Sequence, residues 1–98
     1  MAEAVIVEAV RSPVGKRNGG LSGVHPGELS AQVLNGLVER AGVDPAMVDD
    51  VIWGCSSQRG KQGSCIARMS LLAADWDTRV SGVTLDRFCG SGITSVNM

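Results

Sequence analysis

The sequence predicts an α/β fold in which helices flank a largely parallel sheet. Segments typical of strands and of helices alternate along the chain, and this order favours parallel pairing of the strands. Apolar residues in the helical segments recur at three- and four-residue spacing, and Gly or Pro separates one segment from the next. The chain has 98 residues, enough for one small domain, and we see no internal repeat or linker.

The first half of the chain predicts one strand and one long helix. Residues Ala4–Val10 are rich in Val, Ile and Ala and are typical of a buried strand, and a loop with Pro and Gly follows over residues 11–20. A helix is expected from Pro26 to the capping residue Gly42, with apolar positions at Leu29, Val33, Leu34, Leu37, Val38 and Ala41. Gly36 inside this helix costs about 1 kcal/mol relative to Ala, so we expect another element to pack closely there.

The second half repeats the alternation. Asp44 and Pro45 are typical of a helix start, although only a short turn has room to follow. We then expect a strand over Val51–Cys55, a polar loop over 56–63 and a helix over 64–74. The third strand is expected over Val80–Phe88, and a third helix starts at Gly90.

Composition excludes several classes of function. The net charge is −1, from nine basic and ten acidic residues, which argues against a nucleic-acid partner. Two small basic clusters are expected to be solvated loops, with a local phosphate contact left open: Arg11, Lys16 and Arg17, and Arg59 with Lys61. The longest apolar run is shorter than the roughly 20 residues of a membrane helix, and the N-terminus lacks a secretory pattern.

The cysteines indicate a reducing compartment. Cys55, Cys65 and Cys89 are odd in number and lack the C-x-x-C spacing, and His25 is the single histidine. We therefore expect no metal site, reduced thiols and a cytoplasmic location.

Cys89 is the candidate nucleophile. It is expected at the end of the third strand and in the first turn of the third helix, followed by Gly90 and Gly92, which allow a tight turn. Unpaired N–H groups at a helix start favour an anion such as a thiolate, and they stabilise an oxyanion on a substrate carbonyl. This pattern predicts thioester or acyl chemistry.

The residues alone leave two other interpretations of this segment open. Cys89 fits equally as a small apolar residue in a tight turn. Gly90-Ser91-Gly92 fits part of a dinucleotide-binding fingerprint, although that motif needs Gly or Ala in place of Ser95 and an acidic residue about 20 positions later. Neither Gly15-Lys16 nor Gly60-Lys61 has the rest of a phosphate-binding P-loop.

Several motifs occur in a specific order along nearly the whole chain: EAVRSPVGK (8–16), LSGVHP (21–26), VIWGC (51–55), QG (62–63), IAR (66–68) and DRFCGSG (86–92). Together they resemble the N-terminal part of a thiolase, an acyl-CoA acetyltransferase. The resemblance implies a thiolase-like fold, with residues 1–98 as a partial N-terminal domain that ends at the start of the helix after Cys89.

The resemblance also implies a reaction. Cys89 would accept an acyl group from a coenzyme A thioester, and its backbone N–H would contribute to the oxyanion hole. The family cleaves 3-oxoacyl-CoA thiolytically or joins two acyl groups in a Claisen condensation, with coenzyme A thioesters as substrates and no separate cofactor. Family members resemble homo-oligomers joined partly through the third strand.

This chain departs from the family in length. The family's catalytic histidine, its second catalytic cysteine and its coenzyme A loop belong to later sequence. We expect His25 to serve as a cap or surface residue, and Cys55 and Cys65 to be packing residues. The chain alone is therefore expected to be inactive. We also expect it to be marginally folded or aggregation-prone, because the third helix keeps only about one and a half to two turns and sheet edges stay exposed.

Two alternatives stay open: a non-catalytic thiolase-like fragment that binds a partner or has no activity, and a condensing enzyme similar to a ketoacyl synthase. The Arg-Ser-Pro and His-Pro motifs favour the thiolase.

Overall fold

A computed structural model describes residues 3–98 and shows alternating helices and strands from Pro26 onward. The α-helices are α1 (Pro26–Ala41), α2 (Ile66–Ala73) and α3 (Ser91–Asn97), and the strands are β1 (Asp50–Gly54) and β2 (Ser81–Leu85). Two single-turn 3₁₀ helices, η1 (Pro45–Met47) and η2 (Gly60–Gln62), lie in the connections. The predicted α/β class is thereby confirmed.

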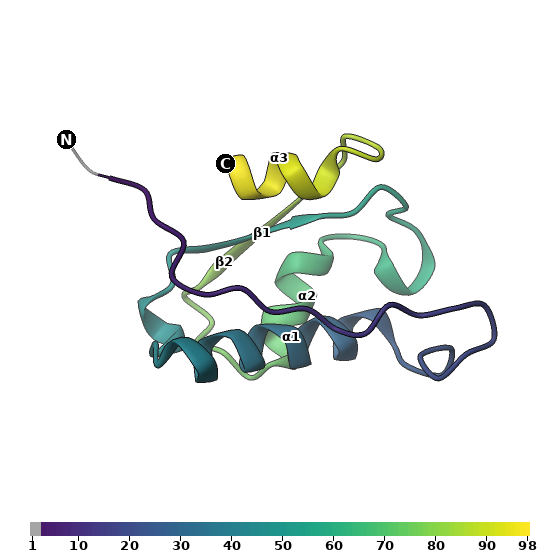
Figure 1. Cartoon of the computed structure of the whole chain (residues 1–98), viewed down its shortest axis with the longest axis horizontal. Coiled ribbons are helices and arrows are strands. Elements are labelled where there is room, and N and C mark those ends of the chain that lie inside the picture. The colour runs from purple at the N-terminus through teal and green to yellow at the C-terminus, as the bar shows by residue number, and fades with distance from the viewer. Residues whose placement is uncertain (1–2) are drawn as a thin grey trace.

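The sheet is parallel and lies between helices. Strands β1 and β2 pair in register from Asp50 opposite Ser81 to Gly54 opposite Leu85. Helices α1 and α2 lie on one side of this pair and α3 on the other, as Figure 1 shows. Because both strands run the same way, the loops that follow Gly54 and Leu85 leave the sheet at one common edge.

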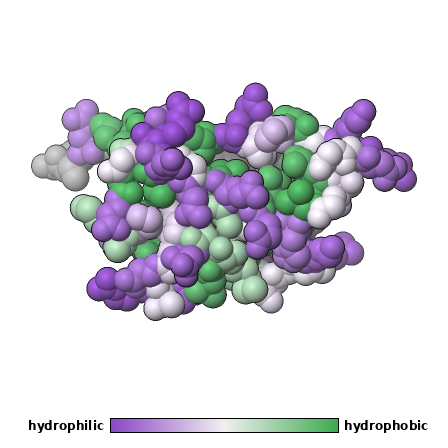
Figure 2. Space-filling view, turned by 90° about the horizontal axis from the view of Figure 1, so that it is seen from below, coloured by the Kyte–Doolittle hydropathy of each residue, from purple (hydrophilic) through white to green (hydrophobic). Residues whose placement is uncertain are grey.

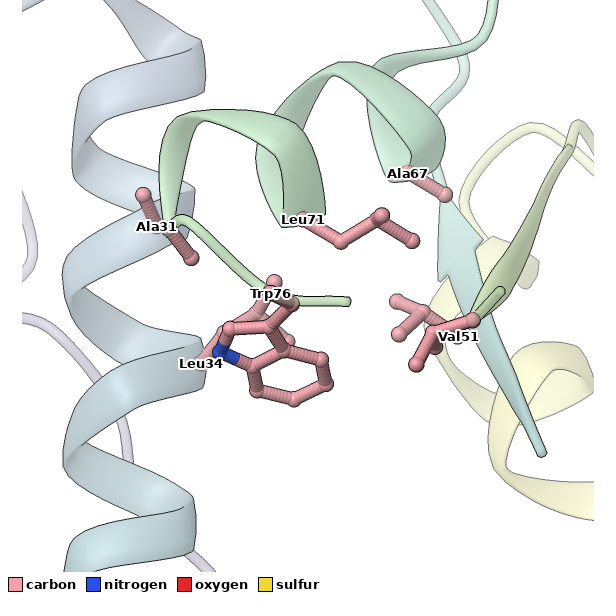
Figure 3. Close-up of a cluster of buried hydrophobic side chains, with 8 residues drawn as sticks. Ala31, Leu34, Val51, Ala67, Leu71 and Trp76 are labelled. Atoms are coloured by element: carbon pink, nitrogen blue, oxygen red, sulfur yellow. The ribbon is translucent and has the colours of Figure 1, made fainter. Parts of the chain in front are cut away.

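The core lies between the sheet and the α1–α2 layer. Its buried apolar residues come from α1, β1, α2 and the α2–β2 connection (Figure 3): Ala31, Leu34, Val51, Ala67, Leu71, Ala74, Trp76 and Val80. Trp76 buries its ring there and donates its indole N–H to Asn35 Oδ1 at 2.7 Å. The polar end of the largest core residue is therefore satisfied, and that removes the main penalty of burying tryptophan.

The helix boundaries predicted from local signals are confirmed. His25 Nδ1 accepts the Gly27 N–H at 3.0 Å as the N-cap of α1, which is the capping role expected for this histidine. At the other end of α1, Gly42 adopts φ +67° as the left-handed C-cap. Asp44 Oδ1 accepts the Ala46 N–H at 3.0 Å and starts the short η1 turn.

The expected strand over Ala4–Val10 is wrong. Neither β1 nor β2 pairs with this segment, which runs beside α1 and leaves Ile6 83% exposed. A strand needs a neighbouring ladder of hydrogen bonds, and a helix surface offers none. The apolar composition thus predicted a strand, but neither strand of the sheet pairs with this segment.

The expectation that another element packs closely against Gly36 is also wrong for residues 3–98. A Cβ atom built on Gly36 would meet nothing within 4 Å. Close approaches occur instead at Gly54 and Gly82, one in each strand.

The underside of the molecule in Figure 2 shows hydrophilic and hydrophobic side chains interspersed.

The helices in residues 3–98 are all too short or too polar to cross a membrane. Several large apolar side chains are exposed, among them Phe88, Ile93 and Val96 near the C-terminal end of the chain. In α3, Ser91 is buried whereas Ile93 and Val96 are exposed, so this helix turns apolar side chains to solvent.

Candidate active site

Cys89 lies in a short loop over residues 86–90 that leaves the carboxyl edge of the sheet. We expected it at the end of the strand and in the first helical turn. The structure corrects both points, because β2 ends at Leu85 and α3 begins at Ser91. Phe88 has φ +46°, a left-handed conformation outside the extended region, so the regular strand expected up to Phe88 does not reach that residue.

Side chains at both ends of the loop hold its backbone. Asp86 Oδ1 accepts the Phe88 N–H at 2.8 Å. Ser91 Oγ accepts the Arg87 N–H at 2.8 Å and donates to the Phe88 carbonyl oxygen at 2.7 Å. The Gly90 N–H donates to the Arg87 carbonyl at 2.9 Å. These bonds offset the strain at Phe88, which is on the order of 1 kcal/mol for a non-glycine residue.

The loop presents Cys89 to solvent. Its side chain is exposed, and Phe88 beside it is 80% exposed. Within residues 3–98, the Cys89 backbone N–H donates no hydrogen bond. The residue is therefore accessible to a group that approaches from outside, and its N–H is not engaged by the loop.

The start of α3 rests directly on the end of β1. A Cβ atom on Gly54 would stand 2.7 Å from the carbonyl carbon and oxygen of Ser91. Only glycine allows the strand and the helix to approach this closely. Sequence reasoning missed both residues as parts of the site, although glycine inside a strand is a known sign of close backbone approach.

Gly54→Ala is expected to push α3 and the attached loop away from the sheet. We expect a loss of about 1–3 kcal/mol in the free energy of unfolding, as for other overpacked positions, together with slower modification of Cys89. Urea denaturation and the alkylation rate of Cys89 measure the two effects. Gly36→Ala is the matched control and should be neutral or stabilising by up to about 1 kcal/mol, because its Cβ meets nothing. Equal results for both variants would refute the importance of the close contact.

The other two cysteines have structural partners. The Cys55 N–H donates to the Leu85 carbonyl at 2.9 Å and extends the ladder at the common edge of the strands. Cys65 is the N-cap of α2, with Sγ 3.4 Å from Thr84 Oγ1, and packs against the core. Burial raises the pKa of Cys65, but hydrogen bonds from Thr84 and from backbone groups at the start of α2 outweigh burial and lower that pKa.

The remaining candidate groups lie outside the Cys89 loop. A cavity of about 690 Å³ lies between residues 10–13 and α1, and its lining includes no residue of 86–91. The basic residues Arg11, Lys16, Arg17, Arg59 and Lys61 are all exposed, as expected for solvated loops. Residues 3–98 contain no cluster of three His, Cys, Asp or Glu side chains placed to hold a metal ion.

Fold and site together define an α/β unit that presents an exposed cysteine on a braced loop at the carboxyl edge of a parallel sheet. Residues 4–98 match the family described as "Thiolase, N-terminal domain". The chain therefore belongs to the thiolase family.

Individual relatives agree with this assignment. The chain is 50% identical over 97 residues to a steroid 3-ketoacyl-CoA thiolase of Mycobacterium tuberculosis, covering 99% of this chain and 24% of the relative. It is 44% identical over 95 residues to a beta-ketoadipyl-CoA thiolase of Pseudomonas aeruginosa, covering 96% and 24%. The crystal structure of the Bacillus anthracis acetyl-CoA acetyltransferase superposes with a TM-score of 0.85 at 44% identity, over 92% of this chain and 23% of that one. The chain thus spans about a quarter of the length of these relatives.

Proposed function

We propose that the protein is an acyltransferase of the thiolase type, in which an acyl group passes between coenzyme A and the thiol of Cys89. The observation that carries this proposal is the exposed Cys89 on its braced loop, in a chain that matches the thiolase N-terminal domain along its length. The named relatives include 3-ketoacyl-CoA and beta-ketoadipyl-CoA thiolases and an acetyl-CoA acetyltransferase, and all of these names specify a coenzyme A thioester.

The proposed step is transthioesterification. Cys89 Sγ attacks the thioester carbonyl, a new bond forms between Sγ and the acyl carbon, and the bond from that carbon to the coenzyme A sulfur breaks. The proton of the Cys89 thiol ends on coenzyme A. The Cys89 N–H, which has no acceptor in residues 3–98, would donate to the oxyanion that forms on the carbonyl oxygen.

A proton acceptor for this step does not come from the single histidine. His25 Nδ1 is engaged with the Gly27 N–H at the start of α1, in the role of a helix cap. Positioned acid and base groups typically contribute about 10²–10⁴-fold in rate, so acylation by residues 1–98 alone should be slow. We propose that the complete reaction, thiolytic or condensing, requires the segments that the longer relatives carry.

Three finer proposals accompany this function. The substrates are 3-oxoacyl and acyl thioesters of coenzyme A of the kind used in fatty acid metabolism, as the relatives' names suggest. A cytoplasmic location fits three cysteines that are all free thiols. Assembly into a homo-oligomer through β2 fits a strand whose outer edge has no neighbour in residues 3–98.

Labelling with acetyl-CoA tests the proposal. The protein as its own cell makes it is incubated with acetyl-CoA, its intact mass is measured, and the acetylated peptide is located after proteolysis. We expect one thioester, on the peptide that contains Cys89, and none on those with Cys55 or Cys65. Equal labelling of all three cysteines, or none at all, would contradict the proposal and favour a non-catalytic thiolase-like fragment.

A further inference from the structure

Ser91 is the first residue of α3, and its side chain also forms hydrogen bonds with the Cys89 loop. Its side chain is buried, with 6% of the residue exposed. The hydroxyl group accepts the Arg87 N–H and donates to the Phe88 carbonyl oxygen, so it joins the two residues that precede the nucleophile. One side chain thus bonds two peptide units of the loop, the one between Asp86 and Arg87 and the one between Phe88 and Cys89.

Cys89 has little else to hold it. Its side chain is exposed, so core packing does not set the direction of the thiol. The residue before it, Phe88, has a left-handed backbone conformation, which a non-glycine residue keeps only when its surroundings enforce it. The position of the thiol and of the Cys89 N–H therefore depends on the hydrogen bonds of residues 86–91.

Ser91 itself is anchored to the sheet. Its backbone carbonyl packs against Gly54 so closely that a Cβ there would stand at 2.7 Å. The strand β1 thus fixes the backbone of Ser91, and the hydroxyl of Ser91 fixes the loop. Through these two contacts, β1 supports Phe88, the residue before the nucleophile.

We infer that Ser91 is a positioning residue for Cys89: its hydroxyl sets the geometry from which the thiol and the N–H of Cys89 meet a thioester carbonyl. The inference rests on the proposed function. A displacement of about 1 Å at a reacting group can cost on the order of 10²-fold in rate. Loss of the hydroxyl should therefore lower the rate of acylation without weakening the binding of acyl-CoA.

The test compares Ser91→Ala with Ser95→Ala in the protein as its own cell makes it. Ser95 is the matched control, because its hydroxyl bonds the Gly92 carbonyl at 2.9 Å with the same three-residue spacing, one turn further along α3. We expect Ser91→Ala to lower the maximal rate of Cys89 acetylation by about tenfold or more, at an unchanged half-saturating concentration of acetyl-CoA. Ser91→Thr, which keeps the hydroxyl, should recover most of the rate, and Ser95→Ala should keep all of it.

A second readout needs no acyl-CoA and separates this inference from the proposed function. The measured quantity is the rate of iodoacetamide alkylation of Cys89 divided by that of Cys55 in the same protein. This ratio should change in Ser91→Ala and in neither of the other two variants. Absence of acetylation in the unaltered protein would refute the proposed function, and the alkylation ratio would then decide about Ser91. An unchanged ratio and unchanged acetylation, with only the melting temperature lowered, would overturn the inference.

The unaltered protein gives a third measurement if Ser91→Ala does not fold. The Arg87 amide proton should exchange with solvent slowly, because Ser91 Oγ accepts its hydrogen bond although Arg87 itself is exposed. The Cys89 amide, which has no acceptor in residues 3–98, should exchange fast. Equal exchange rates at the two amides would overturn the inference.

Discussion

Cys89→Ser is expected to abolish acyl transfer to the protein. A serine hydroxyl at this position has no neighbouring base in residues 3–98 to activate it, whereas a thiol reacts readily as its thiolate. The exposed loop and its hydrogen bonds do not involve the sulfur atom, so folding should be unaffected. The variant thus separates chemistry from structure.

A chimera makes the effect on turnover measurable. Residues 4–98 replace the matching N-terminal quarter of the Bacillus anthracis acetyl-CoA acetyltransferase, a substitution that the TM-score of 0.85 supports. The chimera should transfer acetyl groups from acetyl-CoA, and Cys89→Ser should remove that activity down to the background of the assay. The measurement is the steady-state release of coenzyme A.

Cys55→Ala in the same chimera is the control. Cys55 lies at the same edge of the sheet and also carries a thiol, but its hydrogen bonds, to the Leu85 carbonyl and from the Gln58 side chain, use only backbone groups, which an alanine keeps. We expect this variant to retain most of the activity. Full activity of Cys89→Ser, or equal losses in both variants, would exclude Cys89 as the nucleophile.

Leu71→Ala is expected to have the largest effect on stability. Leu71 is fully buried at the centre of the cluster in Figure 3, between α1 and the sheet. Truncation of a buried leucine to alanine typically costs about 2–5 kcal/mol, through lost burial and a residual cavity. A domain of about 100 residues has a total stability of only about 5–15 kcal/mol, so the urea midpoint should fall steeply. Fluorescence of the buried Trp76 reports the transition.

Leu72→Ala is the matched control for this variant. Leu72 follows directly in α2 but is 43% exposed, so the same chemical change should cost less than about 1 kcal/mol. Helix propensity is altered equally in both variants and cancels in the comparison. Similar urea midpoints for the two would show that the α1–α2–sheet cluster does not stabilise the fold.

Local signals in the sequence predicted the helix ends correctly. His25 with Pro26, Gly42, and Asp44 with Pro45 each act through groups within a few residues, so their geometry depends little on the rest of the fold. The parallel order also followed from the sequence, because a helix between two strands can carry the chain back so that both strands run the same way, and alternation of strands and helices favours this arrangement. The motif around Cys89 similarly pointed to the thiolase family, as the match over residues 4–98 confirms.

The roles of Gly36, Gly54 and Ser91 were decided by tertiary structure. Gly36 drew attention as a weak helix former, yet in residues 3–98 a Cβ there would meet nothing within 4 Å, whereas Gly54 contacts the start of α3. Ser91 is one of several small residues after Cys89, and only the fold shows that its hydroxyl reaches back to Arg87. Such contacts depend on how the elements approach each other, which local sequence does not encode.

The sequence by itself determined the periodicities, the caps and the family motif, because these depend on neighbours in the chain. The tertiary structure decided which extended segment became a strand and where the loop of Cys89 lies. Residues Ala4–Val10 have the composition of a buried strand, but a strand forms only beside a partner, and β1 and β2 pair with each other. Hydrogen-bonded pairing is a property of two segments, so no single segment can specify it.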